Sequence, residues 1–237
     1  MLVVAASPRT RPAKSALSRE AVVAAALAVV DEVGFEAASM RRVAAALDTG
    51  PASLYVYVAD RRELMEAAQD LALAEVELPV AGGWRERLET LVARTVAELA
   101  RHNDIAQAAV ADVPLGPHAL RIHEELLRLL REGGIPDAAC AWAVDFLGQY
   151  VSAVALEQAA WHRAQRAIAD PEKATVEAMG ADFVARIDGV YAGLDAAEFP
   201  TIVALRPLLT AGGGDERDAW KLRVIVDGLL AQGPTPG

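Results

Sequence analysis

Apolar residues recur every three or four positions along most of the chain, which is the spacing of one face of an α-helix. The first clear stripe is made by Val22, Val23, Ala26, Leu27, Val30 and Val33. Ser18 precedes it as a good N-cap, because its hydroxyl can accept from unpaired backbone N–H groups, and Gly34 follows as a helix stop. No segment makes a convincing strand, so the pattern predicts an all-α protein.

A tight turn separates the next two predicted helices. Ser39 is a suitable N-cap for residues 40–47, and Pro51 suits the first turn of the following helix. Asp48 lies in the turn between them, and aspartate tolerates left-handed backbone. Two helices joined by so short a turn form a helix-turn-helix, whose second helix is sized for the major groove of DNA.

A longer helical segment follows. Asp60 and Glu63 have capping-box spacing at the start of a helix expected to run to about Leu78. Helices are then expected over residues 84–102, 105–111, 117–132, 136–163, 174–192, 200–209 and 215–232. We therefore divide the chain into a mobile basic tail (1–17), a helix-turn-helix domain (18–64) and a helical ligand-binding and dimerisation domain (65–237).

Composition limits where the protein works. Hydrophobic residues make up 54% of the chain, but no run approaches the roughly 18 apolar residues that span a bilayer. The N-terminus has no secretory pattern. The single cysteine, Cys140, rules out an internal disulfide and fits a reducing compartment. These features predict a cytoplasmic protein with no membrane contact.

Charge is divided unevenly along the chain. Residues 1–64 hold eight Lys and Arg against seven Asp and Glu, whereas residues 65–237 hold fifteen against twenty-six. DNA phosphate would repel the second part and tolerate the first, so charge would orient the molecule on DNA. Near-neutral charge on the first part is also common in proteins that bind no DNA.

Specific residues within 18–64 resemble the DNA-binding domain of the tetracycline-repressor (TetR) family of bacterial regulators. The segments that carry the resemblance are 34–35, 39–44, 54–58 and 60–64, and weaker similarity extends to Trp84, 132–135 and 226–230. The resemblance implies a homodimeric repressor that binds a palindromic double-stranded DNA operator and is released by a small-molecule effector. Asp48 and Thr49 depart from the glycine and apolar residue usual in that turn.

The resemblance also implies which residues face DNA: Ser39, Arg41, Arg42, Pro51, Ala52, Ser53, Tyr55, Tyr57 and Arg61. Arg41 is the candidate for a base contact, because a guanidinium can grip guanine with two hydrogen bonds. Arg61 stands where the family binds phosphate, at a helix N-terminus that also attracts anions. A solvated Arg41 and a packing role for Tyr55 are the alternatives.

An effector pocket is implied in the second domain, with candidate residues Leu91, Thr95, Val110, Val113, Leu126, Phe146 and Tyr150. Where the resemblance implies magnesium and drug ligands, this chain has mostly apolar residues, so we expect a largely apolar effector and no metal. Trp142, Phe146 and Tyr150 recur every four residues, a pattern more typical of core than of a ligand wall. The helices over 136–163 and 215–232 are expected to form the dimer interface.

Little in the sequence favours an enzyme. The four histidines form no i,i+4 pair for a helical zinc site, and no recognisable catalytic set or nucleotide-binding loop is present. We therefore expect no catalytic residues and no cofactor. The alternative is an all-helical small-molecule-binding protein or enzyme whose N-terminal bundle does not read DNA.

Overall fold

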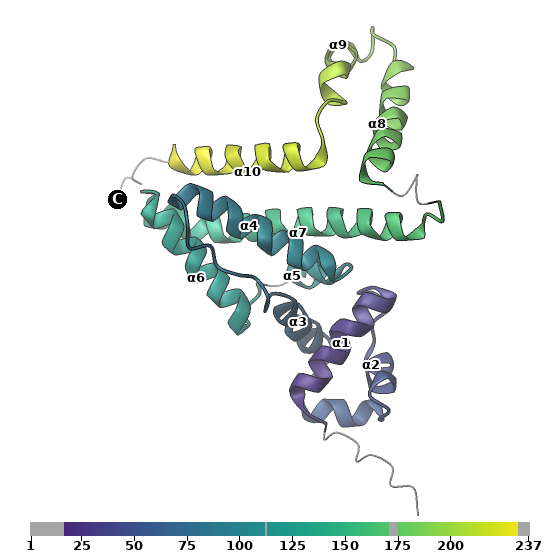
Figure 1. The fold of residues 1–237 in the computed structure, drawn as a ribbon, viewed down its shortest axis with the longest axis vertical. Coiled ribbons are helices and arrows are strands. Elements are labelled where there is room, and N and C mark those ends of the chain that lie inside the picture. Colours follow the sequence, from purple (N-terminus) through teal and green to yellow (C-terminus); the bar gives the residue numbers. More distant parts are fainter. Residues whose placement is uncertain (1–16, 112, 171–174, 232–237) are drawn as a thin grey trace, which may run out of the picture.

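The structure, a computed structural model, describes residues 17–111, 113–170 and 175–231, except for the side chains of residues 110 and 111. All regular elements in these residues are helices, which confirms the all-α prediction. They form a small head at one end and a larger body (Figure 1). The predicted tail lies almost wholly outside the described residues.

The head consists of α1 (Arg19–Val33), α2 (Met40–Ala46), the short helix η1 (Pro51–Val56) and the start of α3 (Arg61–Ala72). Hydroxyl and carboxylate caps begin the α-helices as predicted: Ser18 accepts from the Ala21 amide of α1, and Asp60 accepts from the Glu63 amide of α3. Fully buried Val22, Val43 and Leu54 hold α1, α2 and η1 around one core.

The predicted recognition helix is a 3₁₀ helix of six residues rather than an α-helix. Its six residues make two turns, with i→i+3 hydrogen bonds such as that from the Tyr57 amide to the Leu54 carbonyl (2.9 Å). The turn before it survives the loss of glycine as expected. Asp48 takes the left-handed conformation with φ 50°.

The body contains the remaining helices: α4 (Trp84–Arg101), η2 (Ile105–Gln107), α5 (Ala108–Ala111), α6 (Pro117–Glu132), α7 (Asp137–Ala167), α8 (Val176–Ala192), α9 (Pro200–Leu209) and α10 (Gly214–Leu230). The core lies between α4, α6 and α7, where Leu88, Leu129 and Leu147 are fully buried. These bounds lie within a few residues of those the sequence predicted.

Helix α3 belongs to both head and body. It packs along α1 and also contacts α5 and α6, so the predicted boundary at residue 64 falls inside a continuous helix. The helix ends at Ala72 instead of about Leu78. Beyond it, the backbone carbonyls of Ala74 and Val76 accept from the Arg121 side chain of α6 rather than from another helical turn.

A second junction joins the head to the loop between α4 and η2. The Asp104 carboxylate accepts from the Phe35 amide (2.6 Å), and the Asn103 side-chain amide donates to the Val30 carbonyl at the end of α1 (3.2 Å). Arg163 of α7 donates to the Asn103 side-chain oxygen (2.6 Å). These hydrogen bonds connect the C-terminal end of α1 to the long helix of the body.

Several apolar surfaces of the body are uncovered. Trp142 and Phe146 on α7 are 83% and 50% exposed, and Trp220 on α10 is 60% exposed. Of the aromatic stripe predicted as core, only Tyr150 packs against the core within one chain. Helices α8 and α9 bury no residue and project beyond the α4–α6–α7 layer (Figure 1).

By length and composition alone, α7 is apolar enough to cross a membrane, and its buried face packs on α4 and α6.

Candidate DNA-binding surface and ligand pocket

The residues predicted to face DNA lie mainly on α2 and η1. Arg41 and Arg42 are exposed in the first turn of α2, and Pro51, Ala52 and Tyr55 are exposed on η1. The small side chains at the start of η1 allow close approach to a groove. Ser53 is half-buried, as is Ser39, whose hydroxyl accepts from the Arg42 amide and so caps α2.

Two predicted DNA contacts are engaged within the head. The Tyr57 hydroxyl donates to the Leu17 carbonyl just before α1 (2.7 Å). The Arg61 guanidinium donates to the carbonyls of Ala38 (2.7 Å) and Phe35, and it stacks 4.8 Å above the centre of the Phe35 ring. Their phosphate contacts stay predictions, and the structure adds a role that the sequence did not reveal. Arg61 clamps the loop between α1 and α2.

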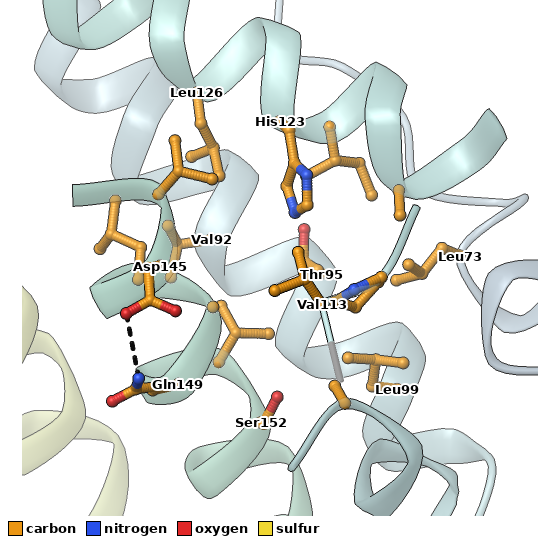
Figure 2. Close-up of a pocket in the computed structure, with 18 of the residues that line it drawn as sticks. Leu73, Val92, Thr95, Leu99, Val113, His123, Leu126, Asp145, Gln149 and Ser152 are labelled. Carbon is orange, nitrogen blue, oxygen red and sulfur yellow. Dashed lines mark hydrogen bonds between the residues drawn. The ribbon is translucent and has the colours of Figure 1, made fainter. Parts of the chain in front are cut away.

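A cavity of about 260 Å³ lies between α3, α4, α6 and α7 (Figure 2). Three of the predicted ligand residues line it: Thr95, Val113 and Leu126. Leu91 is fully buried on α4 and is absent from the cavity wall. The side chain of Val110 lies outside the described residues. A cavity thus lies among the body helices, where the effector pocket was predicted, and the ligand-binding roles of these residues stay predictions.

Phe146 and Tyr150 do not line this cavity, because they project from another side of α7. The cavity wall on α7 includes Val144, Gly148 and Ser152. The Tyr150 hydroxyl donates to the Asp218 carbonyl of α10 (2.9 Å), and burial, with the nearby Asp218 charge, raises its pKa to about 12. Tyr150 therefore joins α7 to α10, and neither of these two residues, which the resemblance implied as ligand contacts, lines this cavity.

Further polar side chains that were not predicted from the sequence line the cavity: Gln69, His123, Asp145, Gln149 and Ser152. His123 projects into the cavity in Figure 2, and burial lowers its pKa, which favours the neutral ring. A sequence signal existed for His123. It interrupts the apolar stripe of Ala119, Ile122 and Leu126 at helical spacing, where a polar residue faces the same interior space.

The head supplies the cap of a body helix. The Asp70 side chain of α3 is 9% exposed, and it accepts from the amides of Ala119 (2.9 Å) and His118 (3.4 Å) at the start of α6. The negative charge also matches the positive end of the α6 dipole. Gly116 makes the approach possible, because a Cβ there would lie 2.1 Å from the Asp70 carboxyl carbon.

No arrangement suited to metal binding is evident in the parts of the chain that the structure describes. They contain no group of three or more His, Cys, Asp or Glu side chains that could hold a metal ion. Cys140 is buried, and burial raises the pKa of its thiol, so the nucleophilic thiolate is disfavoured.

Comparison with known proteins identifies the family. Residues 22–68 match the family described as bacterial regulatory proteins, tetR family, and residues 78–232 match the tetracyclin repressor-like C-terminal domain. The chain belongs to the TetR family of transcriptional regulators. This confirms the resemblance to the TetR family that the sequence indicated, and the predicted domain bounds stay predictions.

Individual relatives agree with this assignment. HTH-type transcriptional repressor DrrR1 of Streptomyces coeruleorubidus is 36% identical over 160 residues, a match that covers 66% of this chain and 59% of the relative. The TetR family protein ActR of Streptomyces coelicolor, solved in complex with actinorhodin, is 33% identical with a TM-score of 0.77, covering 93% of this chain and 99% of ActR.

A third relative was solved on DNA. BioQ with its natural double-stranded DNA operator is 28% identical with a TM-score of 0.55, covering 61% of this chain and 89% of BioQ. Of these two structural relatives, ActR was thus solved with actinorhodin and BioQ with operator DNA.

Replacing Arg61 with alanine tests its clamp. Because the change removes charged donors from two loop carbonyls, we expect the free energy of unfolding to fall by about 1.5–3 kcal/mol, measured by urea denaturation. The matched control is Arg62→Ala, which removes an exposed arginine paired with Glu66 (3.0 Å) and should change stability by less than about 1 kcal/mol. Equal stability of the two variants would contradict the claim that Arg61 stabilises the loop between α1 and α2.

Proposed function

We propose that this protein is a cytoplasmic, homodimeric transcriptional repressor. It binds a palindromic operator through two heads, and a small, largely apolar ligand in the body releases it. It has no catalytic role in this proposal. The observation that carries the proposal is helix α3, which begins beside the DNA-reading elements and ends against the cavity.

Dimerisation is supported by the apolar surfaces that one chain leaves uncovered. Regulators of this family act as dimers. Trp142 and Phe146 on α7 and Trp220 on α10 are large, exposed and on the two helices assigned to the interface from the sequence. Packing these helices against their copies would bury the aromatic surface and place two heads on one side. Two heads fit an operator with two related half-sites.

DNA reading is assigned to the exposed residues of α2 and η1. Arg41 is free of any helix-capping role and can reach a base edge, while Pro51 and Ala52 allow the backbone of η1 to come close. Arg42, Ser39, Ser53 and Tyr55 surround this point and would contact sugar and phosphate. BioQ, solved with its operator, supports the use of this head for DNA.

For the ligand to release the repressor from its operator, it must bind one arrangement of head and body more tightly than the other. A ligand with equal affinity for both arrangements would leave their populations unchanged. The cavity wall includes Gln69 of α3 and Leu73, which directly follows α3, as well as four residues of α6. The Asp70 hydrogen bonds tie those two helices together at the cavity edge. A ligand that moves α6 against α3 would thus tilt the head and change the spacing of the two η1 helices.

Genomic DNA fragments captured with the purified protein test the function. We expect enrichment of a palindromic sequence, and we expect Arg41→Ala to weaken binding to it by about 1–3 kcal/mol while relaxing preference at one position per half-site. Binding to random DNA fragments is the control. Equal losses on cognate and random DNA would remove Arg41 as the base contact, and capture of no preferred sequence would favour the alternative that the head does not read DNA.

Replacing Asp70 with alanine tests the connection between head and body. Loss of the α6 cap should lower the free energy of unfolding by about 0.5–2 kcal/mol and weaken operator binding, because α3 loses its fixed position. Asp70→Asn should retain much of both, since asparagine also caps helices. Glu66→Ala, on the same helix but in a surface ion pair, is the control. Unchanged stability and unchanged operator affinity in Asp70→Ala would contradict the mechanism.

A further inference from the structure

We propose that the cavity recognises a compact, uncharged molecule that carries hydroxyl or carbonyl oxygens, and that Gln69 of α3 and Ser152 of α7 are its hydrogen-bonding partners. This inference rests on the proposed function, since it names the chemical class of the effector. It also gives the helix that reaches the head a direct contact with that effector.

Gln69 provides the main observation. Its side chain is 3% exposed and lines the cavity, yet within the described residues its amide forms no hydrogen bond. Within the described residues only Arg87 Nε is both fully enclosed by protein and without a partner, so the Gln69 amide is accessible from the cavity that it lines. Such a group in the wall of a cavity indicates a site where a ligand supplies the missing partner.

Ser152 makes the same case from the opposite wall. It is 7% exposed, lines the cavity, and its hydroxyl has no partner in the part of the chain that the structure describes. Thr95 differs, because its hydroxyl donates to the Leu91 carbonyl one turn earlier (2.8 Å) and keeps only acceptor capacity. Figure 2 shows Thr95, Ser152 and the His123 ring around the same space.

The charges around the cavity exclude a bound anion. Its described lining residues include no lysine or arginine, and its one carboxylate, Asp145, accepts from the Gln149 side chain at the edge (3.1 Å). Arg121, although on α6, donates to the carbonyls after α3 instead. A carboxylate ligand would lose its hydration without gaining a counter-charge, which is strongly unfavourable. Hydroxyl and carbonyl groups match the neutral partners present.

The size of the cavity sets the scale of the ligand. At about 260 Å³ it lies just below the range of roughly 300–1,000 Å³ for small-molecule sites, so it suits a molecule of two or three rings. Gln69 directly precedes Asp70, so a ligand that pairs with the Gln69 amide acts one residue away from the cap of α6.

Three probes with one ring system test this chemistry in equilibrium dialysis without DNA, read by naphthalene fluorescence: naphthalene, 1-naphthol and 1-naphthoate. We expect the protein to bind 1-naphthol about tenfold more tightly than naphthalene, and 1-naphthoate to bind most weakly. In Gln69→Leu the preference for 1-naphthol over naphthalene should fall below about threefold, with naphthalene bound as well as before. Ser152→Ala should lower the same ratio by a smaller factor.

The control is Gln149→Leu, which removes a glutamine amide from the edge of the same cavity and should leave the ratio within twofold. The inference is overturned if Gln69→Leu keeps the full preference for 1-naphthol, if 1-naphthoate binds most tightly, or if the protein binds none of the probes. Operator binding is measured separately. If the protein prefers 1-naphthol as expected but binds no operator, only the repressor proposal is contradicted. If it binds an operator but shows no preference for 1-naphthol, only this inference is contradicted.

Discussion

The hydrogen bonds from the α6 amides to the Asp70 carboxylate are the interaction on which the rest of this account depends. They make one residue of the DNA-binding unit the N-terminal cap of a helix that walls the cavity. Without them, α3 would be only a connection between two domains. With them, a displacement of α6 either breaks a buried charge–amide contact or carries α3 along, so head and body have few independent arrangements.

The local structure of the head could be predicted from the sequence because its signals are local. Ser18, Ser39 and Asp60 are helix caps whose partners lie three residues away, and Asp48 needed only to adopt a positive φ. Helix ends set by distant partners were not predictable. Helix α3 ends at Ala72, and the carbonyl of Ala74 beyond it accepts from Arg121, which lies almost fifty residues further along the chain.

The candidate site was predictable only in part for the same reason. Thr95, Val113 and Leu126 follow from the resemblance and line the cavity, whereas Phe146 and Tyr150 face other surfaces because α7 has more than one apolar side. Gln69 and Asp70 carry no sequence signal. Their roles arise when Gly116 lets α6 approach α3, a contact between segments that only the folded chain brings together.

Hydrogen–deuterium exchange with and without operator DNA tests the central claim, the coupling of head and body through α3, most directly. Coupling between two sites is reciprocal, so DNA bound to the head must change the stability of the first turn of α6. We expect slower exchange at the Ala119 amide on operator binding, and no such change in Asp70→Ala at saturating DNA. Protection confined to α1, α2 and η1, with α6 unchanged, would contradict it.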